Sequence, residues 1–125
     1  MRTANVKILG EEHLLCLSAR AKCDIEDRWG SLQDAFTALA SEDRRTSLST
    51  TFALLEIMMR SGATYAEKMG IPTAKPLSAD DLWDLCGATD LPDLVHALHE
   101  AVINGSKREV EAEPPKNSET TPPRK

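Results

Sequence analysis

The chain has 125 residues, of which 41% are hydrophobic, 28% charged and 4% aromatic. This length accommodates one domain, whose core must be built mainly from aliphatic side chains and methionine. Three cysteines without a CxxC pair fit neither a disulfide framework nor a zinc knuckle and favour a reducing compartment. The first residues lack a signal-peptide pattern, and no apolar run is long enough for a membrane span. We therefore expect a soluble, cytoplasmic protein without a membrane partner.

The net charge of −5 is concentrated in one part of the chain. Residues 1–75 carry ten bases and ten acids, and the last nineteen residues carry five bases and four acids. Residues 76–106 contain no Lys or Arg and carry six acids: Asp80, Asp81, Asp84, Asp90, Asp93 and Glu100. Such a surface repels phosphate backbones, so we expect no nucleic-acid partner. It suits a basic protein partner, or it simply keeps the protein in solution.

The N-terminal stretch predicts a short β-hairpin. Val6 and Ile8 alternate with polar residues, and Leu15 and Leu17 follow a turn-like Gly-Glu-Glu at residues 10–12. A lone hairpin is marginally stable in water, so it must pack on helices or pair with another subunit. In the second case, its edge would be an oligomerisation site.

From Ala19 onwards the apolar period becomes that of an amphipathic helix. Its stripe consists of Ile25, Trp29, Leu32, Phe36 and Leu39. Gly30 interrupts the stripe and can end one helix, while Ser31, with Asp34 three residues later, can cap the next. The sequence predicts two helices that meet near residue 30, with one continuous bent helix as the alternative.

A second apolar stripe predicts the longest helix, after a polar loop at residues 41–45. The stripe runs through Leu48, Phe52, Leu55, Met59, Ala63 and Ala66. The helix should end at Gly70, before Pro72. Burial of each large side chain contributes roughly 1.5 to 3 kcal/mol, so this stripe should form the main core.

Two shorter helices are predicted further along the chain. Ser78, with Asp81 three residues later, is typical of a helix N-cap, and this helix should reach about Cys86. The last helix should begin at Asp90 and carry an apolar face. The predicted fold is therefore mainly α: a short N-terminal β-hairpin followed by a bundle of four to five helices in a single domain of residues 1–105.

Residues 106–125 form a predicted tail outside this domain. They contain two apolar side chains and four of the seven prolines. Such a segment cannot offset its ordering entropy by burial. We expect a disordered, Pro-rich tail.

Residues that could bind a metal ion lie in the last predicted helix. His96 and His99 are three residues apart, and Asp93 or Glu100 could complete a site. However, the order His-x-x-His-Glu matches no zinc-enzyme motif. We expect two ordinary histidines and no metal ion.

A nucleophilic pair is conceivable at His13 and Cys16. A cysteine among leucines, however, is usually packing material, and burial raises its pKa. No glycine-rich phosphate loop and no GxSxG elbow occurs in the sequence. The sequence predicts no catalytic residue and no cofactor, and hence a protein that is not an enzyme.

Three residues are candidates for protein binding. Met58 and Met59 are adjacent on the long helix and must point in different directions, so one could reach the surface as an adaptable contact. Filling gaps in the core is the more usual role of such methionines. Leu77 and Leu82 occupy the positions of a hydrophobic staple around the Ser78 cap, and Trp83, one position beyond, is expected to be partly exposed. It either anchors an interface or covers the short helix from outside.

Three segments resemble those of a known family. They are residues 18–32 (Ser-Ala-Arg-Ala-Lys-Cys-Asp-Ile-Glu-Asp-Arg-Trp-Gly-Ser-Leu), residues 54–63 (Leu-Leu-Glu-Ile-Met-Met-Arg-Ser-Gly-Ala) and residues 76–82 (Pro-Leu-Ser-Ala-Asp-Asp-Leu). With the preceding hairpin, they resemble the small tail assembly chaperones of long-tailed phages, prophages and gene-transfer particles. The resemblance covers most of residues 5–105 and consists of fold and turn patterns.

The resemblance implies a non-catalytic chaperone in the host cytoplasm that is absent from the finished virion. Such a protein coats the tape-measure protein until tail-tube subunits polymerise around it, and identical copies in a homo-oligomer could supply repeated contacts. The family also implies a longer form made by ribosomal frameshifting. Residues 115–117 (Pro-Lys-Asn) can be encoded with a slippery run, where such a frameshift could occur. The alternatives are a structural virion component, such as a head–tail connector subunit, and a small protein-binding regulator.

Overall fold

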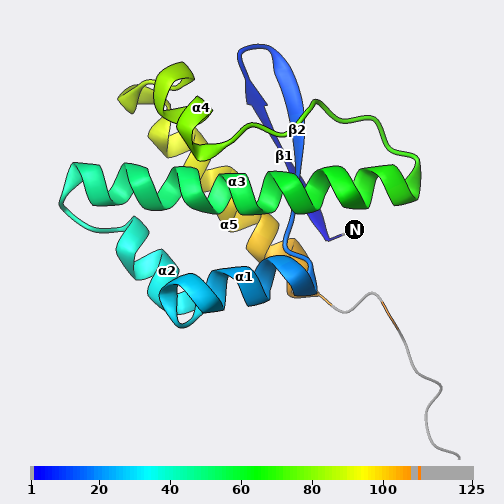
Figure 1. The fold of residues 1–125 in the computed structure, drawn as a ribbon, viewed down its shortest axis with the longest axis horizontal. Coiled ribbons are helices and arrows are strands. Elements are labelled where there is room, and N and C mark those ends of the chain that lie inside the picture. Colours follow the sequence, from blue (N-terminus) through cyan, green and yellow to red (C-terminus); the bar gives the residue numbers. More distant parts are fainter. Residues whose placement is uncertain (1, 108–109, 111–125) are drawn as a thin grey trace, which may run out of the picture.

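The computed structural model describes residues 2–107 and residue 110. This part of the chain is mainly helical and begins with a two-stranded antiparallel hairpin, as the sequence predicts (Figure 1). The elements are β1 (Thr3–Ile8), β2 (Glu11–Cys16), α1 (Ala19–Trp29), α2 (Leu32–Leu39), α3 (Arg44–Met69), α4 (Ala79–Leu85), the short 3-10 helix η1 (Ala88–Asp90) and α5 (Leu91–Gly105). The predicted disordered tail lies almost entirely outside the described residues.

The long helix α3 organises the fold. In Figure 1 it runs along the length of the molecule, with α1 and α2 on one side, the hairpin and α4 on the other, and α5 crossing behind it. One cluster of buried side chains forms the core, and both strands and all five α-helices contribute to it. Among the described residues, no helix is both long enough and apolar enough to cross a membrane.

The hairpin turn lies slightly earlier than predicted. Ile8 pairs with Glu11, so that Leu9 and Gly10 alone form the loop rather than residues 10–12. Both loop residues have positive φ, 51° for Leu9 and 83° for Gly10. Positive φ at both central residues is typical of the type I′ turn, whose twist matches that of a hairpin. The polar pair that resembled a turn in the sequence instead begins β2.

The hairpin packs on helices of its own chain. The backbone of β2 touches α3 at Gly62, where a Cβ atom would lie 1.8 Å from the carbonyl oxygen of Leu14. On the other strand, the side-chain amide of Asn104 in α5 donates a 2.8 Å hydrogen bond to the carbonyl oxygen of Thr3. The hairpin thus obtains from α3 and α5 the support that a lone hairpin lacks.

The outer edge of β2 is covered by the connection between α3 and α4. The Leu14 N–H donates to Oγ1 of Thr73 at 2.9 Å, and the Ala74 N–H donates to the carbonyl oxygen of Glu12 at 3.0 Å. An unpaired strand edge is a template for other chains. Here the chain itself occupies this edge, so β2 does not offer the oligomerisation edge considered above.

The break near residue 30 separates two helices, as predicted. Gly30 has a φ of 96°, and its N–H donates to the carbonyl oxygen of Glu26 at 2.8 Å, which closes α1. The Ser31 hydroxyl then accepts a 2.9 Å hydrogen bond from the Asp34 N–H, which starts α2. Because a glycine with positive φ is followed by a capping serine, the chain forms two separate helices and not one continuous bent helix.

Both adjacent methionines of α3 are fully buried. The expectation that Met58 or Met59 reaches the surface is therefore wrong. It assumed that α3 has one buried and one exposed face, whereas strand β2 and the helices α1, α2, α4 and α5 contact α3 from several sides. The methionine of this helix that reaches the surface is Met69, in its last turn, with 59% of its area exposed.

Candidate protein-binding site

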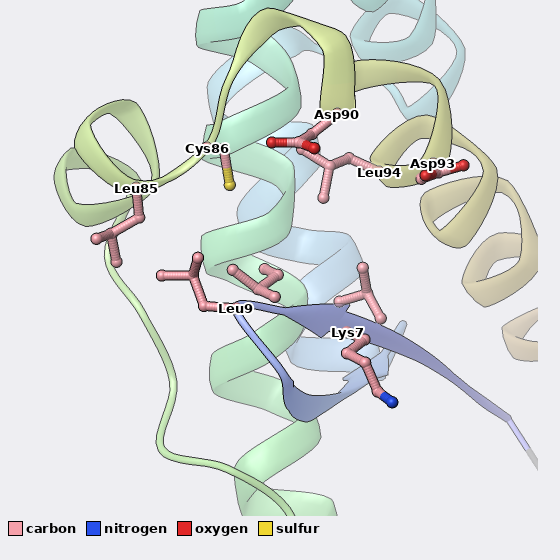
Figure 2. Close-up of a pocket in the computed structure, with 9 residues that line it drawn as sticks. Lys7, Leu9, Leu85, Cys86, Asp90, Asp93 and Leu94 are labelled. Atoms are coloured by element: carbon pink, nitrogen blue, oxygen red, sulfur yellow. The ribbon is translucent and has the colours of Figure 1, made fainter.

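A small depression lies where the hairpin turn meets α4 and the start of α5 (Figure 2). Its volume is about 140 Å³. Five of its nine lining residues are aliphatic and come from the hairpin and two helices: Val6, Ile8, Leu9, Leu85 and Leu94. A cavity of about 150 Å³ holds one benzene molecule, so the depression has room for one apolar side chain. We refer to it as the hairpin depression.

Two exposed leucines form one end of the hairpin depression. Leu9 exposes 70% of its area and Leu85 exposes 45%, and Figure 2 shows them beside each other. Leu9 is also the only non-glycine residue with positive φ in the described chain. A left-handed conformation costs an L-residue about 1 to 2 kcal/mol, and Asn or Gly is usual at this turn position. Leu9 therefore carries a backbone cost without the compensation of burial.

Carboxylates border the other side of the depression. Asp90 and Asp93 line it and are exposed. Asp90 also has a structural role, because its Oδ2 accepts a 2.7 Å hydrogen bond from the Gly87 N–H. The lining also includes the base Lys7, but its ammonium group points away from both carboxylates in Figure 2. The exposed acids predicted in this part of the chain thus lie next to exposed aliphatic side chains.

The Cys86 thiol lines the depression between the leucines and the acids. Burial, together with the neighbouring Asp90 carboxylate, raises the pKa of this thiol. A thiol with a raised pKa stays protonated at neutral pH and reacts poorly as a nucleophile. Cys86 therefore serves as part of the apolar wall.

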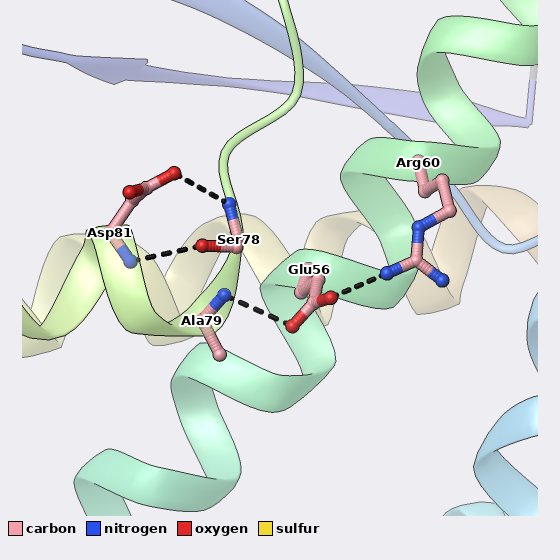
Figure 3. Close-up of polar contacts among 5 residues, drawn as sticks. All are labelled: Glu56, Arg60, Ser78, Ala79 and Asp81. Atoms are coloured by element: carbon pink, nitrogen blue, oxygen red, sulfur yellow. Dashed lines mark hydrogen bonds and ion pairs between the residues drawn. The ribbon is translucent and has the colours of Figure 1, made fainter.

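The start of α4 is capped as the sequence predicts. The Ser78 hydroxyl accepts a 3.1 Å hydrogen bond from the Asp81 N–H, and the Asp81 carboxylate accepts one of 3.2 Å from the Ser78 N–H (Figure 3). This reciprocal arrangement satisfies two N–H groups that a helix start leaves without intrahelical partners. It fixes where α4 begins.

Glu56 connects this capped end to the core helix. One oxygen of its carboxylate accepts a 3.0 Å hydrogen bond from the Ala79 N–H, and the other forms an ion pair with Arg60 on α3 (Figure 3). An anionic group at a helix N-terminus is favourable because the exposed N–H groups carry partial positive charge. Glu56 thus links the first turn of α4, the helix that ends at Leu85, to α3.

Trp83 is partly exposed, as predicted, with 37% of its area accessible. Its ring meets Phe52 edge-on, with centroids 5.1 Å apart, and the Arg45 guanidinium lies 5.9 Å from its ring centroid. The residue is absent from the lining of the hairpin depression. These contacts pack the ring against α3. Its role as a binding anchor stays a prediction.

His13 and Cys16 are not brought together. They lie three residues apart on β2, and residues at that spacing point to opposite faces of a strand. His13 is only 1% exposed, and neither of its ring nitrogens has a hydrogen-bond partner among the described residues. Burial lowers the pKa of the imidazole, and the nearby Glu11 opposes this only in part. The residue therefore packs as a neutral ring.

His96 and His99 have separate partners. His96 lies 3.6 Å from the Glu100 carboxylate on the helix surface, whereas the ring of His99 contacts Phe36 in a tilted arrangement with centroids 4.8 Å apart. Within the described residues, no group of three or more His, Cys, Asp or Glu side chains could hold a metal ion. The spacing in sequence therefore did not produce a common ligand set.

Leu9 and Leu85 were not among the binding residues predicted from the sequence. For Leu9 the sequence does contain a signal, because a large apolar residue directly before Gly10 is unusual in a two-residue hairpin turn. The carboxylates of the depression were recognised only as part of a charged region. Comparisons of the chain with protein-family models, with curated proteins and with solved structures gave no match.

Proposed function

We propose that this protein is a non-catalytic assembly chaperone that binds the tape-measure protein during phage tail assembly. The observation that carries the binding role is the hairpin depression, where Leu9 and Leu85 are exposed beside carboxylates. A chaperone for a long partner needs modest contacts that many copies can repeat. One shallow depression in each copy meets that requirement, because linked weak contacts add up through avidity.

The choice of partner depends on the resemblance to tail assembly chaperones. A mainly helical fold with an N-terminal hairpin agrees with that resemblance. The acids of residues 76–106 also favour a protein partner over a nucleic acid, since they would repel phosphates. Tail-tube subunits would then replace the chaperone on the tape-measure protein.

Affinity purification of the tagged chain from infected or induced cells tests this proposal. We expect the tape-measure protein to be recovered, together with a smaller amount of tail-tube protein. Repeated recovery of neither would contradict the proposal. Mass spectrometry of purified particles provides a second check, because a chaperone is absent from the particle and a head–tail connector subunit remains in it.

The gene offers an independent check on the longer form. A slippery run at the codons for residues 115–117 would allow frameshifting into a downstream reading frame. These residues lie outside the described part of the chain. If the last twenty or so codons contain no slippery run, the frameshift hypothesis loses its support, although the chaperone function does not depend on it.

A further inference from the structure

We infer that the hairpin depression binds a Lys- or Arg-bearing segment of the partner, which inserts one large apolar side chain into the depression against Leu9 and Leu85. This inference rests on the proposed function and specifies its contact. It names both the surface on this chain and the chemistry of the segment that fits it. Three observations carry it: the size of the depression, the charge around it and the conformation of Leu9.

The size and lining of the depression favour an apolar anchor. Its volume of about 140 Å³ matches one aliphatic or aromatic side chain, and five of its nine lining residues are aliphatic. Leu9 and Leu85 stand at its rim with much of their area exposed to water. Insertion of a partner side chain would remove area on both leucines from water, which is the main favourable contribution in such contacts.

The surrounding charge favours a basic segment. Two carboxylates, Asp90 and Asp93, line the depression, against one base, Lys7. The nearby Lys7 directs its ammonium group away from the two carboxylates of the lining (Figure 2). A Lys or Arg that flanks the apolar anchor would therefore meet carboxylates. An acidic segment would be repelled.

The conformation of Leu9 is the most specific of the three observations. Leu9 has a φ of 51°, a conformation that Asn or Gly adopts at lower cost. Its side chain is mostly exposed, so little burial compensates for this cost. A residue that is unfavourable for the turn yet exposed beside a depression is explained if a partner covers it. Replacement by Asn should then improve the hairpin and weaken binding.

Two synthetic peptide pools test the contact on the full chain. One pool contains Leu, Phe, Lys and Ser in random order, and the other has Glu in place of Lys. We expect the wild-type protein to retain peptides from the Lys pool and none from the Glu pool. Peptides of the Lys pool that carry Ser at the Leu and Phe positions should not be retained. Retention of neither pool, or equal retention of both, would overturn the inference.

Variants locate the contact. Leu9→Asn should weaken binding of the retained peptides about tenfold while leaving the urea midpoint unchanged or higher, because Asn suits the turn. Asp93→Lys should weaken it several-fold, whereas Glu100→Lys, the same charge change about 10 Å further along α5, should not. Wild-type affinity in Leu9→Asn, or equal losses in the two charge variants, would overturn the inference.

The same variant separates the contact from the chaperone function. If the wild type recovers the tape-measure protein and Leu9→Asn does not, both proposals are supported. If both recover it equally, the contact is wrong and the chaperone function stands. If neither recovers it while the Lys peptides still bind the wild type and not Leu9→Asn, the contact stands and the chaperone function is wrong.

Discussion

Gly62 lies at the closest approach between the hairpin and the core helix. A Cβ atom at this position would lie 1.8 Å from the carbonyl oxygen of Leu14 and 2.5 Å from its carbonyl carbon. Alanine normally stabilises a helix relative to glycine by about 1 kcal/mol. Here the clash is with backbone atoms that are held in a sheet. The steric cost therefore outweighs the gain in helix propensity, and alanine should destabilise the fold.

We therefore predict that Gly62→Ala lowers the free energy of unfolding by about 3 kcal/mol or more. Urea denaturation monitored by circular dichroism measures this change. Gly87→Ala is the matched control, because the nearest atoms to its added Cβ would be 3.7 Å away and its φ is negative. Equal stability of Gly62→Ala and wild type would show that β2 does not lie directly on α3.

His13 makes stability depend on pH. Its pKa is lowered by burial in the folded state, whereas in the unfolded chain it returns to about 6.5. As the pH falls below that value, the unfolded chain takes up a proton that the folded chain resists. The contribution of His13 to the free energy of unfolding is therefore constant above about pH 7. It falls as the pH drops towards the pKa of His13 in the folded state.

The variant His13→Leu should remove this pH dependence. We expect it to be as stable as the wild type at pH 7.5, because an apolar side chain of similar size replaces a polar ring without hydrogen bonds. At pH 5.5 it should be the more stable of the two. Urea midpoints of both proteins at the two pH values measure the difference, and parallel pH profiles would rule out this role for His13.

The short helix α4 is linked to the core helix at its first turn. It has only seven residues, of which Leu82 alone is buried, so its own packing holds it weakly. The Glu56 carboxylate links its first turn to α3. Loss of this link should loosen α4 without unfolding the rest of the protein.

We predict that Glu56→Ala accelerates amide hydrogen exchange in Ala79–Leu85 about tenfold, with little change in α3. Hydrogen exchange read by mass spectrometry or NMR measures the effect for each segment. Glu67→Ala provides the control, because Glu67 is an exposed acid further along the same helix. The same acceleration in both variants would mean that charge loss on α3, and not the link to α4, is responsible.

At the scale of the whole molecule, a single core implies one cooperative transition. Trp29 at the end of α1 packs against the core cluster, and Trp83 on α4 contacts the core residue Phe52. The two indoles thus report from different parts of the same core. Small domains of this kind usually unfold without populated intermediates.

We predict that each single-tryptophan variant, Trp29→Phe or Trp83→Phe, shows the same urea midpoint by fluorescence as by far-UV circular dichroism. The comparison is made within each variant, so any effect of the substitution on stability cancels. A fluorescence midpoint well below the circular dichroism midpoint when Trp83 is the reporter would reveal that α4 unfolds as a separate unit.

The sequence by itself determined the local structure. Hydrophobic period, capping residues and glycines indicated the hairpin, the break near residue 30, the long helix and the capped start of α4, because each depends on residues a few positions apart. It also located the acidic region. The turn was placed at residues 10–12 instead of Leu9-Gly10, because Leu9 does not have the usual chemistry of a turn residue.

Only the tertiary structure decided which surfaces remain exposed. Met58 and Met59 are buried because neighbouring elements surround α3, and segments nearly sixty residues apart in sequence close the edge of β2 through Leu14 and Thr73. The hairpin depression likewise needs the turn, α4 and α5 to meet. Period and composition report the preference of each element for burial, but they do not specify which element supplies the cover.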